Sequence, residues 1–115
     1  GDKKATVSTD SLVSGVRRAA LLTNEESKGV SMSFSDAGLI MTSRAPEMGE
    51  AELRVDLAEF SGEAIDIGFN PTYVLDALKV VTENQVTLEL KAANKPGLIK
   101  TGPDFLYVVM PVNLQ

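Results

Sequence analysis

Strict alternation of apolar and polar side chains, repeated along the chain, is the feature that most limits how this sequence can fold. Apolar residues at every second position are typical of antiparallel β-strands with one buried face and one wet face. The alternating apolar sets are Val30, Met32 and Phe34; Leu53, Val55 and Leu57; Ile65, Ile67 and Phe69; and Val86, Leu88 and Leu90. Turn-forming residues at 35–38, 61–62 and 83–84 separate them. The sequence therefore predicts antiparallel sheet.

Helical periodicity replaces this alternation in two segments. In the first, Thr9 or Asp10 is a suitable N-cap for a helix that runs to about Thr23. Its predicted core stripe is Leu12, Val13, Val16, Ala19 and Ala20, and its outer face is Ser11, Ser14, Gly15 and Arg18, with Arg17 on the flank. The second helix is expected to begin at Pro71 with Asn70 as its cap. It should bury Val74, Leu75, Leu78 and Val81 and expose Thr72, Asp76 and Lys79.

Shorter strands complete the pattern at residues 5–8, 39–43, 98–100 and 105–110. The expected order is β-α-β-β-β-β-α-β-β-β, an α+β domain with two helices packed on one face of an antiparallel β-sheet. Residues 6–115 are expected to form this single domain, and residues 1–5 a linker or an expression remnant.

Composition argues against several function classes. The net charge of −5 disfavours a free-standing nucleic-acid binder, because neutralising phosphates requires clustered Lys and Arg. The absence of histidine removes the commonest general base and the commonest metal ligand, and no phosphate loop or metal-ligand cluster is found. We therefore expect no enzyme, no metal and no cofactor. The chain has no apolar run long enough to span a membrane. It has no cysteine, which favours the cytoplasm.

Two apolar features have no obvious place in this core. Leu21 and Leu22 fall on the outer side of the first helix, so either the last turn folds them back inward or they meet a partner. The chain also closes on YVVMPVNLQ, residues 107–115. In that segment Val108, Met110 and Val112 alternate and would lie on one side of an extended strand. The alternative is that residues 108–110 are simply part of a core strand, and for Val109 we adopt that interpretation.

Four segments, taken in order, resemble the C-terminal (third) domain of the bacterial DNA polymerase III beta subunit, the sliding clamp. They are VRRAALLTNEESKGV (16–30), IDIGFNPTYVLDALKVV (65–81), PGLIK (96–100) and YVVMPVNL (107–114). Each is modest alone, but their order and spacing are specific, and the similarity covers nearly the whole chain from about Thr6. The resemblance implies a non-enzymatic processivity factor for DNA replication. Such clamps are homodimeric rings of three domains per subunit that encircle duplex DNA without reading its sequence.

The resemblance also implies a groove that docks short clamp-binding peptides of DNA polymerase III, the clamp loader and repair proteins. The matching positions are Asn70, Tyr73, Val108, Met110, Pro111, Val112, Asn113 and Leu114, with Asn94 and Pro96 in the facing loop. Two departures affect this assignment. Asn113 stands where the family often has a basic residue, and Gln115 extends the chain past the usual terminal leucine.

Two further surfaces follow from the resemblance. Arg17, Arg18 and Lys79 would face the DNA in the central hole; the alternative is ordinary solvated surface charge. Leu21, Leu22, Glu47, Glu50 and Glu52 would form the ring interface; for the glutamates the alternative is again solvation. Because the other two domains of the subunit are absent, this chain is expected to be monomeric and to bind peptides weakly.

Two other functions compete with this interpretation. One is a small-ligand-binding or hydrolytic α+β domain that uses acids such as Asp56, Asp66 or Asp104. The other is a stand-alone peptide-binding module that never encircles DNA. Two more domains of the same plan upstream in the full-length chain would exclude the second alternative.

Overall fold

The strands of this chain form two antiparallel sheets, where the sequence predicted one. The computed structural model describes residues 3–21, 29–45, 49–102 and 105–112. The first sheet has the order β5 (Leu57–Ser61), β1 (Lys3–Ser8), β7 (Gln85–Leu90), β8 (Gly97–Thr101), β9 (Phe105–Val109). The second has the order β4 (Gly49–Val55), β3 (Gly38–Ala45), β2 (Val30–Ser35), β6 (Ile65–Phe69). The α+β class and the antiparallel pairing are confirmed.

A corner at Asp56 explains the second sheet. The alternating stretch predicted as one strand is two, because β4 ends at Val55 and β5 begins at Leu57. β4 pairs with β3, whereas β5 pairs with β1 in the other sheet. The alternation of Leu53, Val55 and Leu57 continues through the corner, so it indicates which side chains are inward but not where the chain changes sheets. The described order therefore has one strand more than predicted between the helices.

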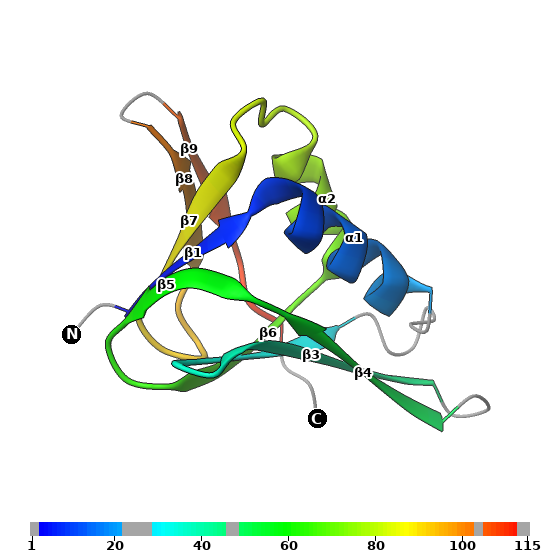
Figure 1. Ribbon diagram of the computed structural model, residues 1–115. Coiled ribbons are helices and arrows are strands. Elements are labelled where there is room, and N and C mark those ends of the chain that lie inside the picture. Colours follow the sequence, from blue (N-terminus) through cyan, green and yellow to red (C-terminus); the bar gives the residue numbers. More distant parts are fainter. Residues whose placement is uncertain (1–2, 22–28, 46–48, 103–104, 113–115) are drawn as a thin grey trace.

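The two helices lie side by side in the angle between the two sheets (Figure 1). α1 (Thr9–Ala20) contacts α2 (Pro71–Leu78) and packs on β1, β3 and β4, while α2 also contacts β9. The prediction that both helices lie together on one side of the antiparallel strands is confirmed. The inward residues of β2 and β7 are buried, as the alternation predicted. Val55, Ile67 and Phe69 are buried as well. Leu53, Leu57 and Ile65 are only partly buried and pack against the edge of the core.

The start of α1 differs from the prediction. Its N-cap is Ser8 rather than Thr9 or Asp10: the Ser8 Oγ accepts a hydrogen bond from the Ser11 N–H at 3.3 Å. Thr9 is buried, and its Oγ1 donates to the Glu83 carbonyl at 2.8 Å, so Thr9 ties the helix to the segment before β7 instead of capping it. α1 ends at Ala20, and the expected end at Thr23 lies outside the described residues.

The buried face of α1 also differs from the prediction. Gly15 was expected on the outer face but is buried. A Cβ at Gly15 would lie 2.5 Å from the Met41 Cε and 3.0 Å from a Val55 methyl carbon. The absence of a side chain therefore lets α1 approach β3 and β4 closely. Val13 and Ala20, predicted for the core stripe, are only half-buried.

The beginning of the chain contributes to the first sheet. β1 starts at Lys3, two residues earlier than the expected first strand. Lys3 and Lys4 pair with Leu90 and Glu89 of β7, so residues 3–5 belong to the sheet and not to a linker.

Candidate functional site

The tail after β9 crosses from the first sheet to the second. β9 ends at Val109, and Pro111 then forms an isolated antiparallel bridge with Phe69 at the end of β6. The Val112 N–H donates a hydrogen bond to the Gly68 carbonyl at 2.9 Å. These contacts hold the apolar tail against the edge of β6, so its backbone has a defined path as far as Val112.

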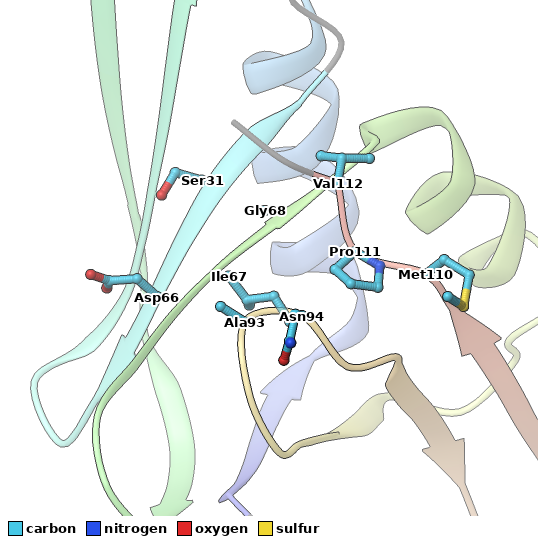
Figure 2. Close-up of a pocket in the computed structure, with 9 residues that line it drawn as sticks. All are labelled: Ser31, Asp66, Ile67, Gly68, Ala93, Asn94, Met110, Pro111 and Val112. Carbon is cyan, nitrogen blue, oxygen red and sulfur yellow. The ribbon is translucent and has the colours of Figure 1, made fainter. Parts of the chain in front are cut away.

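An open cleft of about 520 Å³ lies beside this crossing (Figure 2). Its walls come from four separate parts of the chain: β2, β6, the loop between β7 and β8, and the tail. The lining residues are Ser31, Asp66, Ile67, Gly68, Ala93, Asn94, Met110, Pro111 and Val112. Among these, only Asp66 carries a charge, so the cleft offers mostly apolar surface and backbone polar groups.

Part of the predicted peptide groove is brought together in this cleft. Asn94, Met110, Pro111 and Val112 line it, with Met110 exposed and Pro111 and Val112 half-buried. Asn70, Tyr73, Pro96 and Val108 do not line it. Asn113 and Leu114, like Gln115, lie outside the described residues.

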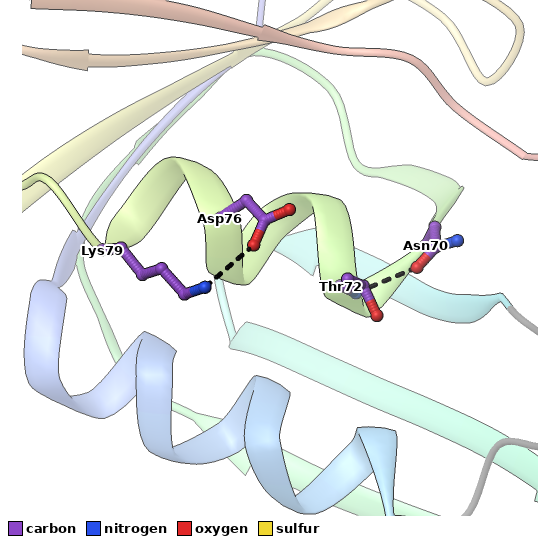
Figure 3. A network of polar contacts seen from close by, with 4 residues as sticks. All are labelled: Asn70, Thr72, Asp76 and Lys79. Atoms are coloured by element: carbon purple, nitrogen blue, oxygen red, sulfur yellow. Dashed lines mark hydrogen bonds and ion pairs between the residues drawn. The ribbon is translucent and has the colours of Figure 1, made fainter.

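The remaining groove positions have other surroundings. The Asn70 Oδ1 accepts from the Thr72 N–H at 2.9 Å, which confirms Asn70 as the N-cap of α2 (Figure 3). Tyr73 is exposed on the first turn of that helix, and Val108 is exposed on β9, the strand that α2 contacts. Pro96 directly precedes the Gly97–Val109 pair of the β8–β9 ladder, and Met110 directly follows it. Val109 is buried, as the core-strand interpretation predicted for that residue.

The sequence did not predict that several residues of the cleft would belong to it. These residues are Ser31, Ile67, Gly68 and Ala93, together with Asp66, which was considered only as a catalytic acid. One of them had a usable signal. A glycine inside an alternating strand often marks the close approach of another backbone, and Gly68 is where the tail hydrogen-bonds. Ser31 and Ala93 have no such signal, because only the fold brings β2 and the β7–β8 loop to the same cleft.

The predicted DNA-facing cations lie on the helices. Arg17 and Arg18 are exposed in the last turn of α1, where a positive charge also interacts favourably with the helix C-terminus. They border a shallow depression that also includes Leu21 and, from α2, Leu75. Lys79 is exposed at the end of α2 and forms an ion pair with Asp76 at 3.3 Å (Figure 3). Part of the Lys79 charge is therefore compensated within its own helix.

The predicted ring-interface residues are partly described. Leu21 follows α1 and is 80% exposed, so for Leu21 the interpretation of a turn folded inward is wrong. Glu50 and Glu52 are exposed on β4, the edge strand of the second sheet, which α1 contacts. Leu22 and Glu47 lie outside the described residues.

The two competing carboxylates in the described part of the chain, Asp56 and Asp66, lie on different segments. Asp56 lies at the corner between β4 and β5 and Asp66 on β6, and both are exposed, while Asp104 lies outside the described residues. Within the described ranges no group of three or more acidic residues could hold a metal ion. In the same ranges no helix is long and apolar enough to cross a membrane.

Comparison with known proteins connects this arrangement with a family. Residues 1–113 match the family described as DNA polymerase III beta subunit, C-terminal domain. The chain belongs to this family. The beta sliding clamp of Vibrio cholerae is 40% identical to this chain, over 84% of this chain and 27% of that relative. The resemblance found in the sequence is thereby confirmed.

Solved structures of this family have the same fold. A DNA polymerase sliding clamp from Pseudomonas aeruginosa superposes on this chain with a TM-score of 0.91 and 34% identity, covering 99% of this chain and 32% of that one. The DNA polymerase III beta subunit from Thermotoga maritima also gives a TM-score of 0.91, at 26% identity, covering 98% of this chain and 31% of that one. The chain thus spans less than a third of the length of its relatives.

Proposed function

We propose that this chain is the third domain of a bacterial sliding clamp, a ring that encircles duplex DNA and keeps DNA polymerase III on its template in the cytoplasm. The proposal extends the family membership to the activity of the whole protein. In this role the chain makes and breaks no covalent bond. It contributes a helical surface to the central hole, a cleft for partner peptides, and one side of the contact between subunits.

The cleft beside the tail is the observation that carries the proposal. A docked peptide needs a concave, largely apolar surface with a few polar groups that fix its orientation. The apolar surface of the cleft comes from Met110, whose side chain is adaptable, and from the more rigid Pro111 and Val112. Asn94 supplies an amide group to the same cleft. Tyr73 and Val108 extend the exposed apolar surface on α2 and β9. We propose that all six contact the peptide, with Asn70, Pro96, Asn113 and Leu114 beside them.

The helices supply the surface proposed to face DNA. Arg17 and Arg18 are exposed cations on α1, and Lys79 lies at the end of the neighbouring helix. Loose contacts of such side chains with phosphates carry no sequence information, which suits a ring that slides. Two acids share this surface, because Asp76 pairs with Lys79 and Asp10 lines the same depression as Arg17 and Arg18.

The proposed contact between subunits is at the end of α1 and the edge of β4. Leu21 offers an exposed apolar side chain, and Glu50 and Glu52 lie on an edge strand. An edge strand presents backbone groups that another chain can pair with. We propose that Leu21 and Leu22, with Glu47, Glu50 and Glu52, meet the first domain of the neighbouring subunit.

A peptide titration followed by NMR tests the proposal. The chain, labelled with ¹⁵N, is titrated with a short peptide rich in glutamine and leucine, and with a scrambled peptide as the control. We expect weak binding with shifts concentrated at Gly68, Tyr73, Asn94 and residues 108–112. Shifts confined to the surroundings of Asp56 or Asp104 would instead support a carboxylate-dependent ligand site and overturn peptide docking. Asp66 does not separate the two functions, because it lines the cleft itself.

A further inference from the structure

Thioethers are the most readily oxidised side chains of this chain, because it has no cysteine and no tryptophan. The described methionines differ sharply in access. Met32 and Met41 are 1% and 0% exposed, whereas Met110 is 58% exposed. Met48 lies outside the described residues. Within the described ranges, an oxidant in solution therefore reaches the sulfur of Met110 and not those of Met32 and Met41.

The backbone of Met110 is held on both sides. Val109, before it, is buried and pairs with Gly97 of β8. Pro111, after it, bridges to Phe69 of β6. The Met110 side chain projects from this fixed segment and lines the cleft beside Pro111 (Figure 2). A chemical change at its sulfur would alter the surface of the cleft while the surrounding contacts keep the tail in place.

We propose that Met110 is an oxidation site at which sulfoxide formation weakens peptide docking; this rests on the proposed function of the cleft. Hydrogen peroxide transfers one oxygen atom to the sulfur, the O–O bond breaks, the thioether loses two electrons, and water leaves. The product carries a polar S–O group where the cleft offered an apolar thioether. An apolar peptide side chain that covers this oxygen removes it from water without supplying a donor, which is unfavourable. Methionine sulfoxide reductases reverse the modification.

The experiment combines mass spectrometry with the peptide titration. The chain is treated with hydrogen peroxide, peptide mapping gives the extent of oxidation at each methionine, and the peptide Kd is measured before and after treatment. We expect Met110 to oxidise well before Met32 and Met41, and the Kd to rise about tenfold, a factor that corresponds to about 1.4 kcal/mol. Treatment with methionine sulfoxide reductase should restore the original Kd.

Two variants assign the effect to the correct sulfur. In Met110→Leu the ratio of Kd after and before peroxide should be close to one, whatever the affinity of the variant itself. In Met48→Leu the ratio should equal that of the parent chain. An unchanged Kd after complete oxidation of Met110, or a full response in Met110→Leu, would overturn the oxidation switch alone. A reduced chain that binds no peptide would overturn the proposed docking function and the switch with it.

Discussion

The Val112 nitrogen and the Gly68 carbonyl oxygen, 2.9 Å apart, join the tail to β6 through a hydrogen bond that Val112 donates. With the bridge between Pro111 and Phe69, this hydrogen bond connects the first sheet to the edge of the second. It also forms one wall of the cleft, because Gly68, Pro111 and Val112 all line it. The path of the tail and the shape of the proposed docking site therefore depend on the same contacts.

Replacing Val112 by proline should detach the tail from β6, because proline has no N–H to donate. We expect a loss of about 1 kcal/mol in the free energy of unfolding, the usual net value of a hydrogen bond, measured by urea denaturation. The NMR signals of Gly68 and Met110 should shift as the wall opens. Val112→Ala is the matched control, since it keeps the donor and should leave the Gly68 signal near its original position. Equal effects of the two variants would contradict the role of the hydrogen bond.

A methyl group at Gly97 should disturb both the core and the tail. A Cβ at this position would lie 2.8 Å from the Phe69 Cζ and 3.1 Å from a Leu90 methyl carbon. We expect Gly97→Ala to destabilise the domain by about 2 kcal/mol through overpacking. Because Phe69 bridges to Pro111, the variant should also shift the Met110 signal.

Gly102→Asn is the control for Gly97→Ala. Gly102 has a φ of +58°, which asparagine tolerates, and no atom lies within 4 Å of its would-be Cβ. We expect little change in the urea midpoint for this variant. If Gly97→Ala were equally harmless, Phe69 could not be packed against Gly97 as described.

Gly15→Ala tests the close approach of α1 to the second sheet. Two effects oppose each other: alanine favours the helix by about 1 kcal/mol, but overpacking costs about 1–3 kcal/mol. The Met41 Cε can move aside, whereas the Val55 methyl carbon, 3.0 Å from the new Cβ, belongs to a short side chain. We therefore expect a net loss of about 1 kcal/mol. Ser14→Ala, exposed on the same helix, should be neutral or stabilising; equal stability of the two variants would contradict the packing.

Local sequence pattern was enough to predict most of the elements of this fold. The alternation in β2 and β7, and Asn70 followed by Pro71 at the start of α2, depend on contacts within a few residues, so they can be read directly. The corner at Asp56 could not be predicted in this way, because the alternation of inward and outward side chains continues unchanged from β4 into β5. Gly15 was placed outside for a related reason. The burial of Gly15 depends on how closely Met41 and Val55 approach it, and a helical wheel gives no information on contacts with other elements.

The candidate site was only partly predictable for the same reason. Met110 and Pro111 were found through the resemblance and the unexplained apolar tail. The opposite wall, with Ser31 and Ala93, comes from segments distant in sequence that share no local signal. Only the strand glycine Gly68 indicated that another backbone would approach.

Asn70 has two roles to separate, that of a helix cap and that of a proposed peptide contact. Asn70→Ala removes the Oδ1 that accepts from the Thr72 N–H and should cost about 1 kcal/mol in unfolding free energy. Asn70→Ser keeps a capping oxygen and should be nearly as stable as the parent chain. If Asn70 contacts the peptide, Asn70→Ser should still raise the peptide Kd. A serine variant with normal stability and normal Kd would leave Asn70 as a cap alone.

Arg17 and Arg18 provide the test of DNA encirclement, made in the full-length ring. Each phosphate contact that is lost should lower the slope of log K for DNA against log salt by about 0.9, so Arg17→Gln/Arg18→Gln should lower it by up to about 2. Glutamine keeps the helix propensity of arginine. Lys79→Gln should have a smaller effect, because Asp76 already pairs with Lys79 at 3.3 Å. Lys95→Gln, in the exposed β7–β8 loop, is the control. A slope unchanged in the double variant, or lowered equally by Lys95→Gln, would contradict a DNA-facing α1.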